Sequence, residues 1–208
     1  SDLIDLRKES NRLALPYKNT KIFTANSYYL HDIFCMYVAI TKNHERNKLF
    51  VIQHGGNYGM AKFNSSEKHQ RKISDYYLTW GWVEDNKTLD IGICKKLRRV
   101  RNKRNTKIEI LLVTTELERY TYMSMSAPQG SMWLDYQNKL EVLFKTIEKH
   151  NFDILVRPKS RNNSWNSLER WQKITSKIDL KSNFHKLCSL SDLVISTYNA
   201  ATYLETMS

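Results

Sequence analysis

The sequence predicts an α/β protein in which parallel sheets are flanked by helices. Short β-branched and aromatic runs alternate with segments whose apolar residues recur at helical spacing, and this alternation is typical of βαβ units. Two such series occur, one on each side of a strongly basic segment at 95–107. We therefore expect a Rossmann-like unit at 1–94, a basic linker at 95–107 and a second Rossmann-like unit at 108–208, with a cleft between the two units.

The first unit is expected to begin with a strand, a helix and a second strand, followed by a polar segment and two short strands. The helix is indicated by apolar side chains three and four residues apart between Leu30 and Ile40. The expected elements are strand 21–24, helix 29–43, strand 49–52, a helix or extended loop at 67–71, strand 75–82 and strand 90–93.

The second unit contains the clearest helix signal, at 132–150, where Trp133, Tyr136, Leu140 and Phe144 form one apolar stripe. A proline at 158 ends the strand before it, because proline cannot donate to a sheet ladder. The expected elements are strand 108–115, helix 132–150, strand 152–158, helix 166–176, strand 192–196 and helix 199–207.

Composition limits the classes of function. The apolar content of 41% supports a core, and no run approaches the roughly 18 apolar residues of a membrane span. No signal peptide is visible, so we expect a cytoplasmic protein. Three scattered cysteines, without a Cys/His cluster at zinc spacing, indicate reduced thiols and no structural metal. The chain starts without methionine and ends within a helical pattern, so we expect a fragment of a longer protein.

The net charge is +12, and eight basic residues fall between Lys95 and Lys107. Such a segment could face nucleic acid, anionic lipid or a phosphorylated substrate, or it could be a solvated linker. Aromatic residues do not interleave with it, so the stacking platform of a single-strand binder is missing.

The first candidate site is a glycine-rich turn directly after strand 49–52. Its residues are Gln53, His54, Gly55, Gly56, Asn57, Tyr58 and Gly59. Dense glycine lets backbone N–H groups approach a ligand, and open α/β sheets bind ligands at the carboxyl ends of their strands. The turn is neither a Walker loop nor GxGxxG. His54 could act as base, acid or phosphate donor, or it could be a structural histidine that fixes the turn.

Three ordered motifs resemble a family of bacterial transferases from surface-polysaccharide and nonulosonate gene clusters. The first is the turn 53–59. The second combines Glu67 and His69 with Ile-Ser-Asp at 73–75 and Thr-Trp-Gly-Trp at 79–82. The third is Ser-Thr-Tyr-Asn at 196–199, with small residues and Leu-Glu at 204–205. The resemblance covers roughly residues 16 to 208. One departure is Gln70, where the family pattern has an acidic residue.

The resemblance implies a GT-B-like glycosyltransferase without cofactor that moves a sugar from a nucleotide donor, with CMP-nonulosonate or CMP-Kdo favoured, to a surface glycan or glycolipid. The absence of a DxD pair favours a metal-independent mechanism. The expected partners are these substrates and an anionic membrane at its inner face, without nucleic acid. A nucleotide-sugar epimerase and a basic nucleic-acid-binding module are the alternatives.

The candidate catalytic residues are His54 and the alternative bases Glu67, His69 and Asp75. Glu67 and His69 are two residues apart, so both face one ligand only if their segment is extended. The substrate-binding candidates are Gly55, Gly56, Tyr58, Gly59, Trp80, Trp82, Arg119, Arg157, Ser196, Thr197, Tyr198, Asn199 and Glu205.

Each of these binding candidates has a plainer alternative. Trp80 and Trp82 could stack on a sugar or belong to the core. Arg119 and Arg157 could neutralise a donor phosphate or carboxylate, or pair with a surface carboxylate. The segment 196–199 could bind an anion at a helix N-terminus or simply cap that helix, in which case Glu205 is a surface residue.

Overall fold

The computed structural model describes residues 2–14, 19–26, 30–43, 45–93, 108–120, 128–159, 164–199 and 201–206. The chain divides into two compact units, residues 1–96 and 97–208, which we call unit 1 and unit 2. The predicted basic linker at 95–107 lies outside the described residues.

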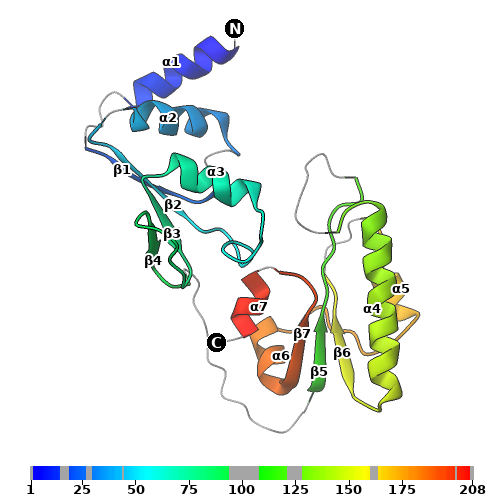
Figure 1. Cartoon of the computed structure of the whole chain (residues 1–208). Coiled ribbons are helices and arrows are strands. Elements are labelled where there is room, and N and C mark those ends of the chain that lie inside the picture. Colours follow the sequence, from blue (N-terminus) through cyan, green and yellow to red (C-terminus); the bar gives the residue numbers. More distant parts are fainter. Residues whose placement is uncertain are drawn as a thin grey trace. The chain divides into compact units, whose positions relative to one another are not determined.

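Unit 1 is built on a four-stranded sheet in the order β1-β2-β3-β4, with every pair of neighbours parallel (Figure 1). Two helices alternate with the strands, and a third, α1, precedes them and contacts α2. The elements are α1 Asp2–Ala14, β1 Lys21–Thr24, α2 Asp32–Lys42, β2 Lys48–Ile52, α3 Ser65–Ile73, β3 Tyr76–Thr79 and β4 Thr88–Asp90.

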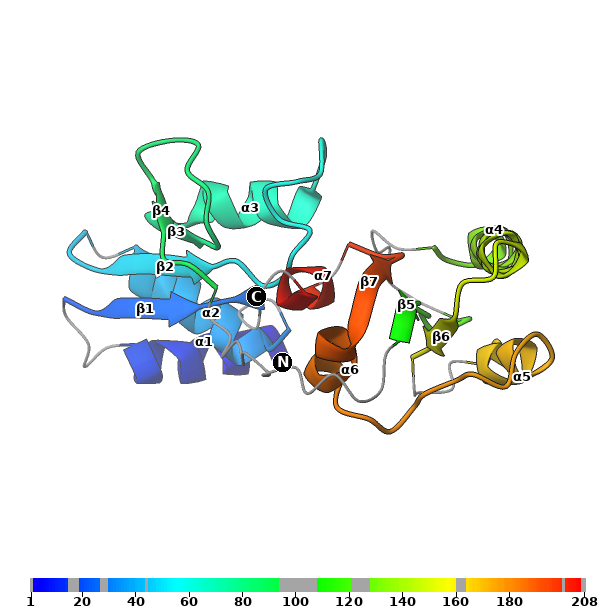
Figure 2. The same cartoon turned by 90° about the horizontal axis from the view of Figure 1, so that it is seen from below.

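The two faces of the unit 1 sheet differ. Helices α2 and α3 lie on one face, and in Figure 2 the strands stand in front of them. The covered face carries the core, formed by Ile22, Leu49, Val51 and Tyr77 together with Val38 and Tyr58. On the opposite face Phe23, Phe50 and Tyr76 are register partners, and their rings stack at 4.6 and 5.2 Å. Phe23 remains 58% exposed, so this row of aromatic rings lies at the surface.

Unit 2 contains a three-stranded parallel sheet in the order β6-β5-β7 (Figure 1). The first strand of this unit along the chain, β5, is therefore the central one. The chain reaches β6 and then β7, on either side of β5, through crossovers that contain helices. The elements are β5 Ile108–Val113, α4 Ser131–Lys149, β6 Ile154–Arg157, α5 Ser167–Gln172, α6 Phe184–Leu190, β7 Ser191–Ser196 and α7 Ala201–Thr206.

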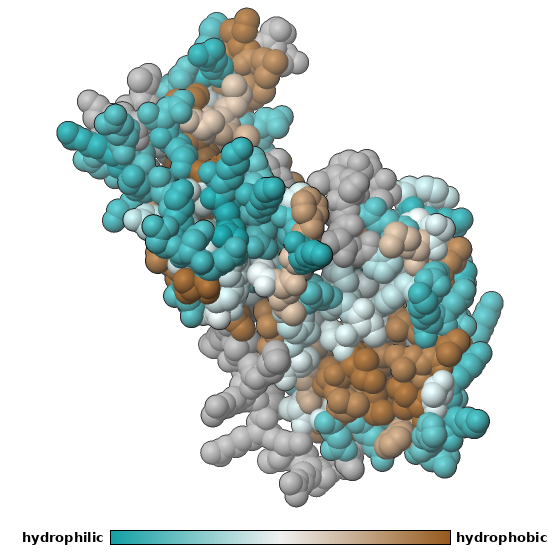
Figure 3. All heavy atoms as spheres, viewed as in Figure 1, coloured by the Kyte–Doolittle hydropathy of each residue, from teal (hydrophilic) through white to brown (hydrophobic). Residues whose placement is uncertain are grey.

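The core of unit 2 joins α4 to the sheet. Leu140 and Phe144 of α4 pack with Ile110, Leu112, Ile154, Val156 and Trp171. Leu111 points to the opposite face of β5 and is also fully buried, which fits a sheet covered on both sides. Figure 3 shows apolar side chains gathered over the strands and α4 of this unit. The exposed large apolar side chains of these elements are those of Met132, Leu134, Val142 and Leu193.

The predicted α/β class with helix-flanked parallel sheets is confirmed, while a GT-B pairing of two Rossmann-like units stays a prediction. The strand predicted at 75–82 is shorter, because β3 ends at Thr79 and Gly81 adopts a positive φ of 96°. Trp80 and Trp82 therefore lie beyond the strand and not on one of its sides. Helices α1 and α6 were not predicted from the sequence.

Candidate functional site

The glycine-rich turn of unit 1 is held in place by the buried side chain of Gln53. Its carboxamide oxygen accepts hydrogen bonds from Trp80 N and Trp82 Nε1, both at 2.9 Å. Its carboxamide nitrogen donates to the carbonyl oxygens of Gly55 at 2.8 Å and Tyr58 at 3.5 Å. One amide therefore joins the turn after β2 to the turn after β3, at the carboxyl edge of the sheet.

Gly59 ends this turn with a positive φ and in close contact with the Trp82 side chain. Its φ is 76°, and a Cβ at this position would lie 2.5 Å from the indole of Trp82. Its backbone N–H donates to Glu67 Oε2 at 2.9 Å, so the start of α3 also fixes the turn. Glu67 is 8% exposed and lies 3.8 Å from Arg71. The tight fit explains why residue 59 is glycine and gives Glu67 a structural task.

Gln70, the departure from the family pattern, is fully buried beneath the turn. Its carboxamide nitrogen donates to the hydroxyl of Tyr58 at 3.4 Å, and its oxygen accepts from the hydroxyl of Tyr77 at 3.3 Å. A neutral amide can serve as donor and acceptor at once, which an ionised carboxylate cannot. Gln70 therefore joins two tyrosine hydroxyl groups inside unit 1.

The structure separates the four candidate catalytic residues. His54 is exposed and directly follows the carboxyl end of β2. Glu67 and His69 lie on helix α3, where Glu67 is buried under the turn and His69 is exposed. Since the segment is helical and not extended, these two side chains do not face one ligand. Asp75 precedes β3 and so lies at the amino edge of the sheet, opposite the turn.

Asp75 is occupied by structural contacts at that amino edge. Its carboxylate accepts from Leu49 N at 2.8 Å and from Lys42 Nζ at 3.1 Å, and Lys48 Nζ lies 3.8 Å away. Burial alone would raise the pKa of Asp75, but the hydrogen bond from Leu49 and the two lysines outweigh burial and lower it. A carboxylate stabilised in its ionised form is a weak proton acceptor, so this position suits a structural anion.

In unit 2 a chain of hydrogen bonds joins the loops that follow β5 and β7. Thr115 N donates to the Tyr136 hydroxyl at 3.1 Å, and Tyr136 and Thr197 share a hydrogen bond of 2.5 Å. Because the Thr197 hydroxyl donates to Val113 O at 2.8 Å, Tyr136 must donate to Thr197. Burial raises the pKa of the Tyr136 phenol, and the two hydrogen bonds oppose this only in part.

The polar side chains of the segment 196–199 differ in their hydrogen bonds and in their exposure to solvent. The Ser196 hydroxyl donates to Tyr198 O at 3.2 Å, and the Thr197 hydroxyl is used as described. Asn199 is exposed. The side chain of Glu205 lies outside the described residues, although its backbone belongs to α7. The loop at the end of β7 thus presents Asn199 to solvent at the carboxyl edge of the unit 2 sheet.

Two cations lie at the carboxyl end of β6, Arg157 as its last residue and Lys159 two residues later. Arg157 donates to the backbone oxygen of Asp179 at 3.0 Å and to its carboxylate at 2.7 Å. This matches the alternative in which Arg157 pairs with a carboxylate. Lys159 Nζ donates to Glu116 O at 2.8 Å and remains exposed.

Arg119 is exposed, with its guanidinium 5.1 Å from the ring centroid of Trp165 and 5.6 Å from that of Tyr120.

The family model described as LIC12162 family transferase matches residues 2–208. The chain belongs to the LIC12162 family of transferases. No curated protein and no solved structure matches it. In the parts of this transferase that the structure describes, no helix is long and apolar enough to cross a membrane, and no group of three histidine, cysteine or acidic side chains could hold a metal ion.

The LIC12162 family transferase thus presents two sets of strand-end loops, one in each unit. Unit 1 brings His54, the glycine turn and Trp80 together at the carboxyl edge of its sheet. Unit 2 brings Thr115, Thr197 and Asn199 to the corresponding edge of its own sheet. Asp75 and His69 do not join these sets.

Three residues hold the transferase's loops in place, but the sequence did not identify them as part of a site. Gln53 and Gln70 were noted as part of motifs, and Tyr136 as part of an apolar stripe. Each is a polar group inside an otherwise apolar environment, and such groups require hydrogen-bond partners when buried. The tyrosine on the apolar stripe was the available signal for Tyr136, whereas no sequence pattern indicates which groups the two glutamines bind, since their partners lie 2 to 29 positions away.

Proposed function

We propose that this transferase is a GT-B-like glycosyltransferase. It moves a sugar from a nucleotide donor, with a CMP-linked nonulosonate or Kdo favoured, to a cell-surface glycan or glycolipid without a metal ion. Its place is the cytoplasm, at the inner face of the membrane. Membership of a transferase family and the parallel α/β architecture of both units support this proposal.

The single observation that carries the proposal is the position of His54. This exposed imidazole follows the carboxyl end of a parallel strand, on a turn that Gln53 fixes through four hydrogen bonds. A base held on a rigid support can accept the proton of an acceptor hydroxyl as that oxygen attacks the sugar. The bond between the sugar carbon and the donor oxygen then breaks, and the nucleotide leaves with the electron pair. The proton ends on His54.

We assign the donor nucleotide to the loops at the carboxyl edge of unit 2. Open α/β sheets bind ligands outside the carboxyl ends of their strands. Asn199 and Lys159 are exposed there, and the chain from Thr115 through Tyr136 to Thr197 holds two of the loops at fixed positions. Arg157 contributes less than expected, because Asp179 already neutralises its guanidinium.

A thermal-shift panel of CMP, CDP, UDP, GDP and ADP tests this function. A nucleotide that binds only the folded state stabilises it by about 2.7 kcal/mol at 100 times its dissociation constant. We expect the largest shift with CMP. A shift with UDP or GDP alone would mean that the donor is a UDP- or GDP-linked sugar and not a CMP-linked one. Absence of any shift, together with steeply salt-dependent oligonucleotide binding, would favour a nucleic-acid-binding module instead.

A further inference from the structure

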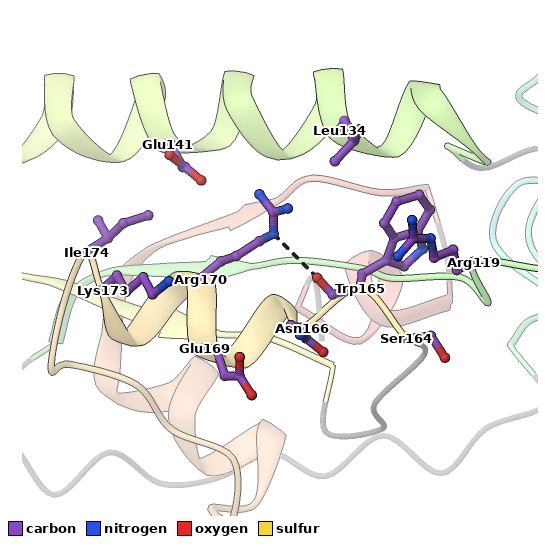
Figure 4. A pocket seen from close by; sticks show the side chains of 10 residues that line it. All are labelled: Arg119, Leu134, Glu141, Ser164, Trp165, Asn166, Glu169, Arg170, Lys173 and Ile174. Carbon is purple, nitrogen blue, oxygen red and sulfur yellow. Dashed lines mark hydrogen bonds between the residues drawn. The ribbon is translucent and has the colours of Figure 1, made fainter.

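Unit 2 contains a hollow of about 580 Å³ that the proposed glycosyl transfer does not use. It lies between α4 and α5 and is bounded at one end by the segments that follow β5 and β6 (Figure 4). Its volume lies within the range of small-molecule sites in proteins. The side chains that matter for its chemistry are those of Arg119, Glu141, Trp165, Glu169, Arg170 and Lys173.

The end wall of the hollow is a preformed stack of aromatic rings and guanidinium groups. Trp165 stacks on Trp133 with ring centroids 4.6 Å apart, and its indole N–H donates to Leu117 O at 3.1 Å. The Arg119 guanidinium lies 5.1 Å from the Trp165 ring, and the Arg170 guanidinium lies 5.7 Å from the Trp133 ring. Both indoles are more than nine-tenths buried, so neither offers an open face on which a nucleobase could stack.

The charged groups that line the hollow favour an anion. Figure 4 shows the Arg170 guanidinium extending from α5 toward α4, into the space beside Glu141. Within the part of the chain that the structure describes, no carboxylate lies within 4.0 Å of a nitrogen on the side chains of Arg119, Arg170 or Lys173. Among the described residues, the lining therefore has three cations and two carboxylates, and none of these cations pairs directly with a described carboxylate.

The lining also contains acceptors for hydroxyl groups. Glu141 points from α4 toward the same space as Arg170, and the Asn166 amide lies at the lower rim. A carboxylate beside a guanidinium can accept from a hydroxyl of a ligand whose acidic group binds the cation. A purely inorganic anion would leave Glu141 facing it without compensation.

We propose that this hollow binds a small organic anion that also carries hydroxyl groups, such as a sugar phosphate or a sugar acid. The acidic group binds Arg170 and Lys173, and a hydroxyl group donates to Glu141. The site lies between α4 and α5, and its proposed ligand carries no nucleotide. It would suit an anionic regulator of the transferase.

Isothermal titration of the whole chain with four probes tests the proposal. The probes are inorganic phosphate, glucose 1-phosphate, glucuronate and, as a neutral control, glucose. We expect at least one of the two sugar anions to bind and glucose not to bind. Glucose 1-phosphate binding without glucuronate binding assigns the site to phosphate esters, and the reverse assigns it to carboxylates. If neither sugar anion binds, the proposal is wrong.

Three charge-matched variants locate the binding. Arg170→Gln and Lys173→Gln each remove one cation from the hollow, whereas Lys145→Gln removes an exposed cation from α4 that does not line it. We expect an affinity loss of about tenfold or more for the first two and little change for the third, because hydrogen bonds to charged groups contribute about 1.5–3 kcal/mol. Equal affinities in all three would overturn the assignment.

Lys173→Gln keeps the test decisive if Arg170→Gln fails to fold. Arg170 also contacts Trp133 and donates to Trp165 O at 3.4 Å, so its loss can disturb the wall. Lys173 is exposed, and the hydrogen bonds that it donates to described residues come from its backbone N–H. Its replacement should leave the melting temperature unchanged while the affinity for the sugar anion falls.

Discussion

The carboxamide oxygen of Gln53 lies 2.9 Å from the indole nitrogen of Trp82, although 29 positions of sequence separate the two residues. This contact, with the one to Trp80 N, couples the glycine turn to the turn after β3. Replacement of Gln53 by methionine keeps a similar side-chain length but leaves several groups without partners. We expect a loss of about 2–4 kcal/mol in the free energy of unfolding, because each unsatisfied buried group costs about 1–3 kcal/mol.

Urea unfolding measures this loss, with Gln172→Met as the matched control. Gln172 is an exposed glutamine at the end of α5, so its replacement should change stability by less than about 0.5 kcal/mol. A Gln53→Met protein as stable as the control would show that the amide is not required to hold the turn.

Gly59→Ala should destabilise the protein by about 2 kcal/mol or more. A non-glycine residue with positive φ costs roughly 1–2 kcal/mol, and here the added Cβ would also meet the Trp82 indole at 2.5 Å. Gly92→Ala is the control, because Gly92 has a φ of 69° but no atom within 4 Å of the added Cβ. The difference between the two variants in urea unfolding isolates the contact with Trp82. Equal losses would mean that the indole moves aside freely.

His54→Ala should reduce sugar transfer by roughly 10²-fold or more, the usual contribution of a positioned acid–base group. Because His54 is exposed, the melting temperature should hardly change. The measurement is transfer per folded molecule in the full-length protein, and His150→Ala, an exposed histidine after α4, is the control. If the variant loses stability but keeps its activity per folded molecule, His54 is a structural residue and the base lies elsewhere.

Asp75→Asn should lower stability by about 1–2 kcal/mol at neutral pH, since it removes a charged hydrogen-bond acceptor that Leu49, Lys42 and Lys48 share. The pKa of Asp75 is lowered in the folded state. Its contribution to stability is therefore present above the unfolded pKa of about 3.9 and is lost as the pH falls through the lower folded value.

Urea unfolding at several pH values checks this sign. The wild-type protein should lose more stability than Asp75→Asn as the pH falls below about 4, so that the two curves approach each other. Transfer per folded molecule should stay near the wild-type level, because Asp75 lies at the amino edge of the sheet. A large loss of transfer at unchanged stability would return Asp75 to the catalytic candidates.

Much of the fold could be predicted because strand and helix periodicity is a local property. Every described strand coincides with or overlaps a predicted one, since short β-branched and aromatic runs alternate with helical stripes. Helix α6 was missed because its seven residues offer one buried side chain, Leu187, and so no stripe. The observed strand boundaries differ from the predicted ones where a turn ends the strand early, as at Gly81.

For the candidate site, the sequence predicts a location but not the contacts that its residues make. The glycine density after β2 predicts a site at the carboxyl edge of the unit 1 sheet, but the contacts of individual residues there reach across 8 to 29 positions. Glu67, a candidate base, accepts from Gly59 N, and Arg157, a candidate phosphate ligand, binds Asp179. Sequence spacing alone does not determine which neighbour a polar side chain finds in the fold.

The stacked indoles of Trp133 and Trp165 have an optical consequence. Two transition dipoles held at a centroid distance of 4.6 Å couple and split their absorption, and a paired positive and negative band appears in circular dichroism when the two dipoles are skewed. Because both indoles lie in unit 2, this couplet would be a label-free spectral signature of that unit. Trp165→Phe would abolish this band pair. Ligand binding that changes the arrangement of these two rings could then be followed in the unlabelled protein by circular dichroism.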